Sequence, residues 1–190
     1  MKSRIKEVLL PTAVLTLICV IVAAALAGTN LLTKEKIAEQ AEKKAGESRA
    51  LVLPGASYFE EAPDGSHYIG SASEGGAAIG YVFEASAKGY GGDVSVMTGI
   101  NTEGKITGVV ILSHEETPGL GANAEKEDFR AQFLQDAPPH GLELVKYQTP
   151  AAGQVEAITG ASMTSGAVTD AVNQAIESYQ NTYASEGGNN

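Results

Sequence analysis

The longest hydrophobic segment of the chain is an uninterrupted run, residues 8–33, that contains no charged side chain. As a helix, this run reaches about 39 Å at 1.5 Å per residue, whereas the hydrocarbon core of a bilayer is about 30 Å thick. A run that is apolar on every face is uncommon for a buried helix of a soluble protein. We therefore expect a transmembrane anchor over residues 8–33, with residues 1–7 on one side of the membrane and the remainder of the chain on the other.

A cleavable signal peptide is the alternative interpretation of this segment. Lys2, Arg4 and Lys6 precede the run, and residues 25–27 (ALA) match the small-residue pattern of a cleavage site. The run is longer than the roughly 7–15 residues of a signal-peptide core, however, and apolar residues resume at Leu31. An uncleaved anchor is the better prediction. Basic residues lie on both sides of the run, so charge counting alone does not orient it.

Downstream of the anchor, the pattern of polar and apolar positions changes. Residues 34–50 are rich in charges and helix formers, which predicts a juxtamembrane helix or linker that ends at Pro54-Gly55. Beyond it, segments rich in β-branched and aromatic residues predict strands, and apolar positions at helical spacing predict helices. The predicted strands cover residues 67–69, 78–87, 93–100, 105–112 and 155–158, and the predicted helices cover residues 125–134 and 166–183.

These elements predict an α+β fold for residues 51–183. The turn Asn101–Gly104 joins two strands of similar length, which is typical of an antiparallel hairpin. We expect one domain with a small antiparallel sheet and flanking helices, carried on the N-terminal helix. Residues 184–190 are small and polar, and are expected to form a disordered tail.

Charge and cysteine content exclude several function classes. The chain of 190 residues has a formal net charge of −10, and residues 51–190 hold five basic against 18 acidic side chains. Such an acidic surface is unsuited to nucleic acid or to anionic lipid headgroups. A single cysteine, Cys19, rules out internal disulfides and cysteine-based zinc or iron–sulfur sites, and three scattered histidines predict no metal site.

Two glycine-rich loops are candidates for ligand binding. Residues 88–92 (KGYGG) combine three glycines, which allow close approach of the backbone to a ligand, with the flat ring of Tyr90. Residues 114–122 (HEETPGLGA) follow a predicted strand, where ligand sites are common. Each loop also has a structural interpretation: the first as a tight strand connection and the second as a solvated turn. No second histidine follows His114 at the spacing of an HExxH zinc site.

A third polar stretch, residues 156–168 (EAITGASMTSGAV), leads into the predicted terminal helix. It contains four hydroxyl side chains among small residues. A helix N-terminus carries unpaired N–H groups and a partial positive charge, and therefore suits a phosphate. The hydroxyls are able to cap the helix, donate to phosphate oxygens or be esterified by phosphate. An ordinary N-terminal cap explains the same pattern.

The order of these features resembles the FMN-binding domain family. A single N-terminal anchor is followed by GYGG, ETPGLG at residues 116–121, and TGAS-x-T before a terminal helix. More narrowly, the pattern is similar to the G subunits of Rnf ion-translocating electron transport complexes. The C subunits of sodium-translocating NADH:quinone reductases share the hydroxyl motif. The resemblance covers essentially the whole chain.

The resemblance implies a covalently bound FMN. In that family a flavin transferase joins FMN, through its phosphate, to the last residue of the motif D-x-x-(S/T)-G-A-T. The motif falls on residues 156–162 here, with Glu156 in place of Asp and Ser162 in place of Thr, so Ser162 is the implied acceptor and Thr164 the second choice. The implied cofactor-binding residues further include Thr159, Gly160, Ala161 and Thr164 near the phosphate, and Tyr90, Thr117, Gly119 and Leu120 near the isoalloxazine ring or ribityl chain. No catalytic residue and no metal ligand is implied.

The resemblance also implies a place in the cell and a set of partners. The N-terminus is expected in the cytoplasm and the flavin domain on the outer face of the cell membrane. There the flavin relays electrons among other Rnf-type membrane subunits, coupling ferredoxin:NAD+ electron transfer to ion translocation. The flavin transferase is a partner during maturation only.

Two other functions fit parts of the pattern. One is a tethered extracytoplasmic binding or scaffold domain without cofactor, in which the hydroxyl motif only caps a helix. The other is a secreted hydrolase with Ser162 as nucleophile, although residues 159–166 (TGASMTSG) lack the G-x-S-x-G elbow.

Overall fold

The structure is a computed structural model that describes the backbone of residues 2–184 and the side chains of residues 9–183. The chain divides into two compact units between Lys43 and Lys44. The predicted disordered tail, residues 184–190, lies almost entirely outside the described residues, as does the N-terminal Met1.

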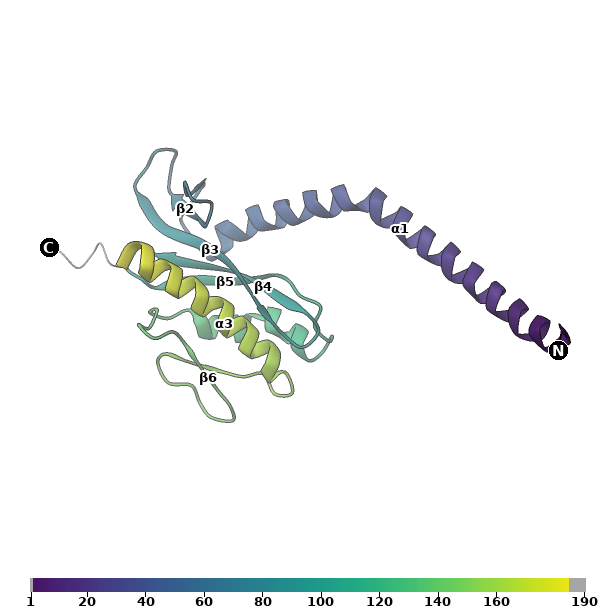
Figure 1. Cartoon of the computed structure of the whole chain (residues 1–190). Coiled ribbons are helices and arrows are strands. Elements are labelled where there is room, and N and C mark those ends of the chain that lie inside the picture. Colours follow the sequence, from purple (N-terminus) through teal and green to yellow (C-terminus); the bar gives the residue numbers. More distant parts are fainter. Residues whose placement is uncertain (1, 185–190) are drawn as a thin grey trace. The chain divides into compact units, whose positions relative to one another are not determined.

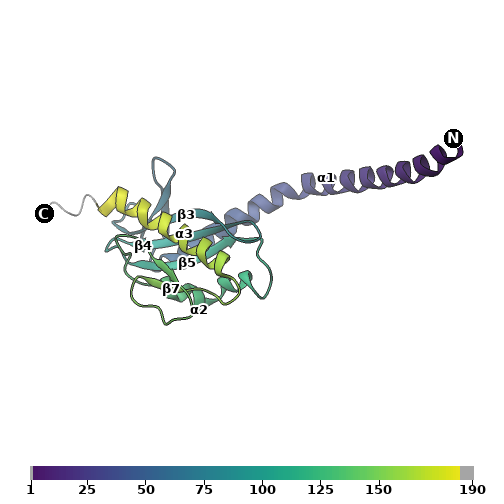
Figure 2. The same cartoon turned by 60° about the horizontal axis from the view of Figure 1, so that its bottom comes forward.

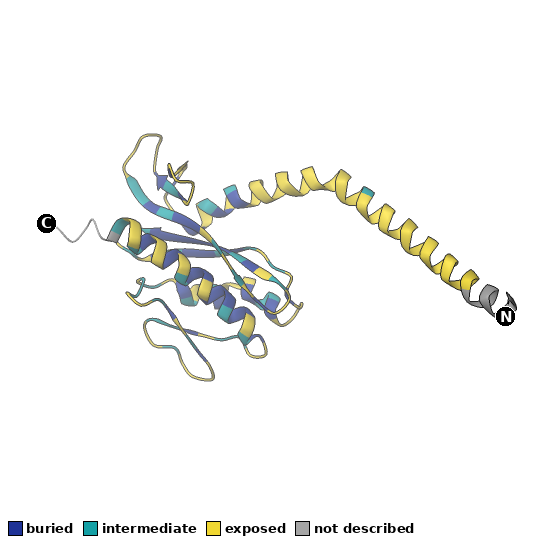
Figure 3. Cartoon of the chain, in the orientation of Figure 1, coloured by how far each residue is buried: buried dark blue, intermediate teal, exposed yellow. Residues whose placement is uncertain are grey.

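One helix, α1 (Lys2–Val52), covers both the predicted anchor and the predicted juxtamembrane segment. The most apolar 18-residue stretch of this helix has a mean hydropathy of 2.6 and contains no buried residue, and Figure 3 colours this part of the helix almost entirely as exposed. Within the described residues, α1 is the one helix that is long and apolar enough to cross a membrane. The helix therefore fits a single-pass anchor. It ends at Val52, as the Pro54-Gly55 pair predicts.

Five antiparallel strands form the main sheet, in the order in which they occur along the chain. They are β1 (Tyr58–Glu61), β2 (His67–Ser71), β3 (Ala78–Lys88), β4 (Asp93–Asn101) and β5 (Ile106–Ser113). The predicted hairpin is confirmed, since β4 and β5 pair on either side of a turn in which the N–H of Gly104 donates to the carbonyl of Asn101 at 3.0 Å. The pattern did not predict β1, because its four residues are mostly exposed and carry no alternation.

A second, two-stranded sheet contacts α3 (Ser162–Tyr179) and η2 (Ala131–Phe133). It pairs β6 (Glu143–Val145) with β7 (Gln154–Glu156) in parallel. The prediction of a strand at residues 155–158 is confirmed in part by β7, whereas β6 was not predicted. Three residues are too few to produce a recognisable period, so neither strand is strongly specified by its own sequence.

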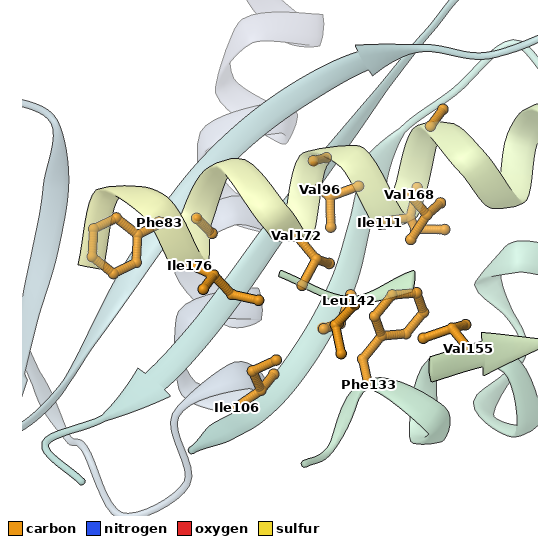
Figure 4. Close-up of a cluster of buried hydrophobic side chains, with 14 of the residues drawn as sticks. Phe83, Val96, Ile106, Ile111, Phe133, Leu142, Val155, Val168, Val172 and Ile176 are labelled. Carbon is orange, nitrogen blue, oxygen red and sulfur yellow. The ribbon is translucent and has the colours of Figure 1, made fainter. Parts of the chain in front are cut away.

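The terminal helix α3 (Ser162–Tyr179) crosses one face of the main sheet, against β3 and β4 (Figures 1 and 2). It begins four residues before the predicted start and ends in a π-helical turn, Gln180–Ala184. The large core lies between this helix and the sheet. Figure 4 shows Val168, Val172 and Ile176 of α3 reaching toward Phe133, Leu142 and the sheet residues. This burial, rather than intrinsic propensity, holds the helix in place.

The prediction of a helix over residues 125–134 is confirmed in part. A short α-helix, α2 (Glu127–Arg130), continues directly into a 3-10 turn, η2 (Ala131–Phe133), and a break separates them from an earlier 3-10 turn, η1 (Gly121–Glu125). The break comes at Lys126, whose backbone is extended, with φ −69° and ψ 145°. The four-residue spacing of Phe129 and Phe133 still brings the two side chains together, because their rings meet edge to face with centroids 5.3 Å apart.

The opposite face of the sheet holds the end of α1, residues 44–52, and the turn that follows. Two cross-strand glycine pairs form the floor of this contact, Gly99 opposite Gly108 and Gly70 opposite Gly80. A Cβ on Gly99 would lie 2.1 Å from the carbonyl oxygen of Val52, and one on Gly108 would lie 2.4 Å from the Val52 Cα. The second pair seats the side chain of Leu53 in the same way. We call the four glycines the glycine floor.

Polar contacts fix the same junction. The hydroxyl of Thr107 donates to the Val52 carbonyl at 2.5 Å, and the ammonium group of Lys44 donates to the carbonyl of Leu112 at 2.6 Å. The guanidinium of Arg49 lies 3.8 Å from the centroid of the Tyr68 ring, a cation–π contact. The helix end is thus an integral part of the domain.

A buried histidine, His67 on β2, organises a polar chain at the far end of α3. The Ser66 hydroxyl donates to Asp64 at 2.8 Å, so the ring Nδ1–H of His67 donates to Ser66 Oγ, also at 2.8 Å. His67 Nε2 then accepts the hydroxyl of Tyr183. The ring also stacks on Phe83 at a centroid distance of 5.1 Å. Burial lowers the pKa of His67, and the nearby Asp64 only partly offsets this effect.

This lowered pKa predicts a loss of stability in mild acid. The unfolded chain takes up a proton on His67 near pH 6.5, the folded chain only at lower pH, so the free energy of unfolding falls as the pH drops below about 6.5. One proton limits the slope to about 1.4 kcal/mol per pH unit. Denaturant unfolding of the full chain in detergent at several pH values measures it. His67→Gln should flatten the slope and exposed His140→Gln should not; equal slopes in all three proteins would contradict the assignment.

Candidate functional site

Three of the segments that the sequence indicated meet around one pocket, together with Tyr147 from the loop between β6 and β7. The three are the loop between β3 and β4, the segment that follows β5, and the start of α3. The pocket has a volume of about 560 Å³. It is lined by Tyr90, Glu116, Thr117, Leu120, Gly121, Tyr147, Gly160, Ala161, Ser162, Met163 and Thr164. The structure thus brings together the three glycine-rich stretches that the sequence indicated.

The first segment is a tight connection. The N–H of Gly89 donates to the carbonyl of Gly92 at 2.8 Å, which closes the turn between β3 and β4. Gly91 passes so close to the second segment that a Cβ there would lie 2.1 Å from the carbonyl oxygen of Glu115. The loop is therefore a tight strand connection, and it also places Tyr90 in the pocket wall, where this residue is 73% exposed.

Glu116 joins all three segments. Its side chain is 6% exposed. One carboxylate oxygen, Oε1, accepts the backbone N–H groups of Tyr90 at 2.8 Å and Gly91 at 3.0 Å. The other, Oε2, accepts the hydroxyl of Thr164 at 2.6 Å. Gly121 leaves room for this arrangement, since a Cβ there would lie 2.5 Å from both Glu116 Oε2 and Thr164 Oγ1.

These hydrogen bonds keep Glu116 ionised. Burial by itself raises the pKa of a carboxyl group, because it disfavours the charged form. The donors from Thr164, Gly91 and Tyr90 act in the opposite direction, with a smaller contribution from His114, and the net result is a pKa below the usual value for glutamate. The group is therefore a carboxylate at neutral pH.

The start of α3 has no side-chain cap. Its N-cap position is Ala161, and the preceding Gly160 has φ +78°. The hydroxyl of Ser165 is used inside the turn, where it donates to the Ala161 carbonyl and accepts the N–H of Ile158, both at 3.0 Å. The interpretation of the motif as an ordinary N-cap box therefore does not hold. The uncapped N–H groups of the first turn carry the positive end of the helix dipole to the pocket wall.

The hydroxyl groups of the motif have different environments. Ser162 is half-buried and lines the pocket. Thr164 is 2% exposed, and its hydroxyl donates a hydrogen bond to Glu116. Thr159 is exposed and lines a different depression, next to Gln132 and Glu156.

The other residues expected at the site also differ in whether they line the pocket. Thr117, Leu120, Gly160 and Ala161 line the pocket with Tyr90, as expected. Gly119 does not; it is exposed and supplies the positive φ, +79°, of the turn between Thr117 and Leu120.

Four lining residues were not predicted as binding residues: Glu116, Gly121, Met163 and Tyr147. The first three lie within motifs that the sequence singles out, so their positions could have been inferred. Tyr147 has no sequence signal, because it comes from the loop between β6 and β7. It is 87% exposed and is the one non-glycine residue of the described chain with a positive φ, +56°. A bulky residue in this region of φ/ψ space is strained.

The pocket fits a flat ligand that carries an anionic group. Its volume is within the roughly 300–1,000 Å³ of small-molecule sites. Tyr90, Leu120, Tyr147 and Met163 provide exposed aromatic and apolar surface, and the helix N-terminus provides donors for a phosphate. Among the described residues, no histidine lines the pocket, so Ser162 has no base beside it of the kind that a hydrolase needs.

Comparison with known proteins gives two family matches along the chain. The RnfG N-terminal region matches residues 1–48, and the FMN-binding domain matches residues 89–177. The second range contains every residue that lines the pocket.

Individual relatives agree with these matches. The G subunit of the proton-translocating ferredoxin:NAD(+) oxidoreductase complex of Clostridium ljungdahlii is 34% identical, over 86% of each chain. The G subunit of the Na(+)-translocating complex of Acetobacterium woodii is 36% identical, over 88% of this chain and 89% of that one. The crystal structure of Shewanella oneidensis NqrC, at 22% identity, has the same fold with a TM-score of 0.54; the match covers 63% of this chain and 59% of NqrC. These matches show that the chain belongs to the RnfG family of FMN-binding-domain proteins.

Proposed function

We propose that the chain is the membrane-anchored flavoprotein subunit of an Rnf-type complex and that it relays electrons through FMN esterified to Ser162. The observation that carries this proposal is the position of Ser162. Its hydroxyl opens a helix with no side-chain cap and faces a pocket with exposed aromatic walls. A phosphate bound at that oxygen meets the positive end of the helix.

Ser162 is a better acceptor than Thr164. A hydroxyl that forms a phosphoester must lose its proton and be accessible to the transferase. The Thr164 hydroxyl is buried and engaged with Glu116, whereas Ser162 is partly exposed. Serine supplies the same nucleophilic oxygen as the threonine usual in the family motif. Glu156, which replaces the aspartate of that motif, lies outside the pocket and lines the neighbouring depression with Thr159.

The chain's own residues position the cofactor. Gly160, Ala161 and the first turn of α3 are expected to hold the phosphate, and Tyr90, Thr117 and Leu120 are expected to contact the ring or ribityl chain. Thr159 and Gly119 are expected to act through the shape of their turns. FMN supplies redox chemistry that no side chain here provides, so the protein contributes position and electrostatics. A covalent bond retains the carrier in a pocket that is open to solvent.

The membrane helix and the relatives support a place in a multi-subunit complex. Both relatives are named as subunits of ferredoxin:NAD(+) oxidoreductase complexes that move ions. We propose that this chain acts with the other membrane subunits of such a complex, and with a flavin transferase during its maturation. We further propose that residues 1–7 face the cytoplasm and that the flavin domain, residues 51–183, lies on the outer face.

Intact mass of the native chain tests the attachment. Protein produced together with the transferase should weigh more than the bare polypeptide by one FMN minus one water, since the ester replaces one P–OH and the Ser162 O–H. The added mass should lie on the peptide that contains Ser162. Protein that is colourless and has no added mass would instead favour a tethered scaffold domain.

A further inference from the structure

We propose that the Glu116 carboxylate is a fixed negative charge in the wall of the flavin pocket and that it lowers the reduction potential of the attached flavin. This inference rests on the proposed function, because it concerns a flavin carried by Ser162. It assigns to Glu116 a role beyond the structural one of joining three segments. No proton transfer by Glu116 is involved.

The Glu116 carboxylate lies in the wall of the pocket that also contains Ser162. Glu116 and Ser162 line the same pocket, and Thr164, which donates to Glu116, lies two residues after Ser162 in the first turn of α3. Glu116 is 6% exposed, so water screens its charge less than it screens a surface charge. The three hydrogen bonds that hold it leave it little freedom to turn away.

All three of its donors are neutral. Two are backbone N–H groups and one is a threonine hydroxyl, so they stabilise the carboxylate without cancelling its charge. The ion pairs of the described side chains do not include Glu116. His114, which makes a small contribution to the lowered pKa of Glu116, uses Nδ1 to accept the backbone N–H of Glu116 at 3.0 Å. Its Nε2 lies 3.5 Å from a carboxylate oxygen of Glu125.

A fixed negative charge opposes the addition of an electron nearby. Reduction places negative charge in the pocket, and the Coulomb repulsion from a buried carboxylate is several times larger than that from an exposed one. Removal of the Glu116 charge should therefore favour the reduced flavin by about tenfold or more in the one-electron equilibrium, and a tenfold change corresponds to about 59 mV. The many exposed acidic side chains of the domain should contribute less, because salt screens them.

Glu116→Gln is the test variant. Glutamine has the same shape, keeps one oxygen for the two N–H donors, and turns its amide toward the Thr164 hydroxyl, which is able to accept as well as donate. Glu115→Gln is the matched control: it removes the same charge one residue earlier, from an exposed side chain outside the pocket. Full-length proteins matured with the transferase are titrated with redox dyes at pH 8, and each is weighed to determine the flavin content.

A midpoint potential more positive in Glu116→Gln by the stated amount, with Glu115→Gln close to wild type, supports the proposal. Equal potentials in wild type and Glu116→Gln at equal flavin content overturn it, as does an equal rise in both variants. High salt adds a further check: it should shrink any difference caused by Glu115 and leave the Glu116 difference in place.

Thr164→Val provides a second measurement, in which the midpoint potential should not rise. It removes one hydrogen bond from the carboxylate but keeps the charge, so the potential should fall or stay at the wild-type value. If Glu116→Gln fails to take up flavin, this variant decides, and a rise in its potential overturns the proposal. Absence of flavin from the wild-type chain is a separate result, visible by mass, and it refutes the proposed attachment rather than the role of Glu116.

Discussion

Replacement of Ser162 by alanine is expected to abolish covalent flavin. Wild-type protein matured with the transferase should carry close to one FMN per chain, and the Ser162→Ala protein should carry none. The physical reason is that no other hydroxyl of the motif both lines the pocket and is free of an internal hydrogen bond. Intact mass and the flavin absorbance of the denatured, washed protein measure the difference.

Ser178→Ala is the matched control for this prediction. It makes the same substitution near the other end of α3, where the serine is exposed and lies outside the pocket, so the flavin content should stay near one per chain. If the added mass persists in Ser162→Ala, Thr164 becomes the attachment site. That outcome would require the buried contact between Thr164 and Glu116 to open during maturation.

Gly99→Ala should strongly destabilise the domain. The new Cβ would lie 2.1 Å from the Val52 carbonyl oxygen and 2.6 Å from its carbon, both of them backbone atoms that no side-chain rotation removes. Either the strand or the end of α1 must shift, and the buried contacts of Val52 and Leu53 are lost with it. We expect a loss of about 3 kcal/mol or more, at the upper end of overpacking effects. Urea unfolding of the full chain in detergent gives the value.

Gly166→Ala is the comparison for the glycine floor. Gly166 lies inside α3, and a methyl group added there would have its nearest side-chain neighbour 4.0 Å away, on Leu144. Alanine favours a helix over glycine by about 1 kcal/mol, so this variant should be as stable as wild type or more so. If Gly99→Ala unfolds at the same urea concentration as wild type, the contact between α1 and the sheet is looser than the structure indicates.

The sequence predicted the elements that have a clear period and enough length. Residues 78–87 and the hairpin around Asn101–Gly104 have both, and each appears in the structure as β3 or as β4 and β5. The short strands β1 and β6 have neither, and the helix predicted over residues 125–134 begins only after the extended residue Lys126. In these places, tertiary packing rather than local pattern decides the backbone.

The three segments that line the pocket could be predicted from the sequence, but the contacts that join them could not. GYGG, ETPGLG and TGAS indicated the correct segments, because glycine and hydroxyl residues cluster in them for reasons that local chemistry explains. Nothing local shows that Glu116 binds Thr164, 48 positions further along the chain. The position of Tyr147 depends on a loop between two three-residue strands, for which the sequence holds no signal. A pairing across such distances is visible only after folding.

The glycine floor has a practical consequence for any attempt to prepare the flavin domain without its anchor. A truncation at residue 51 follows the predicted domain boundary, yet it removes the helical turns whose Ala45 and Ser48 are buried. The strip of sheet around Val82 and Met97 would then be open to water and prone to self-association. A soluble fragment should therefore start upstream of Lys44, so that it keeps the last turns of the helix as part of its own core.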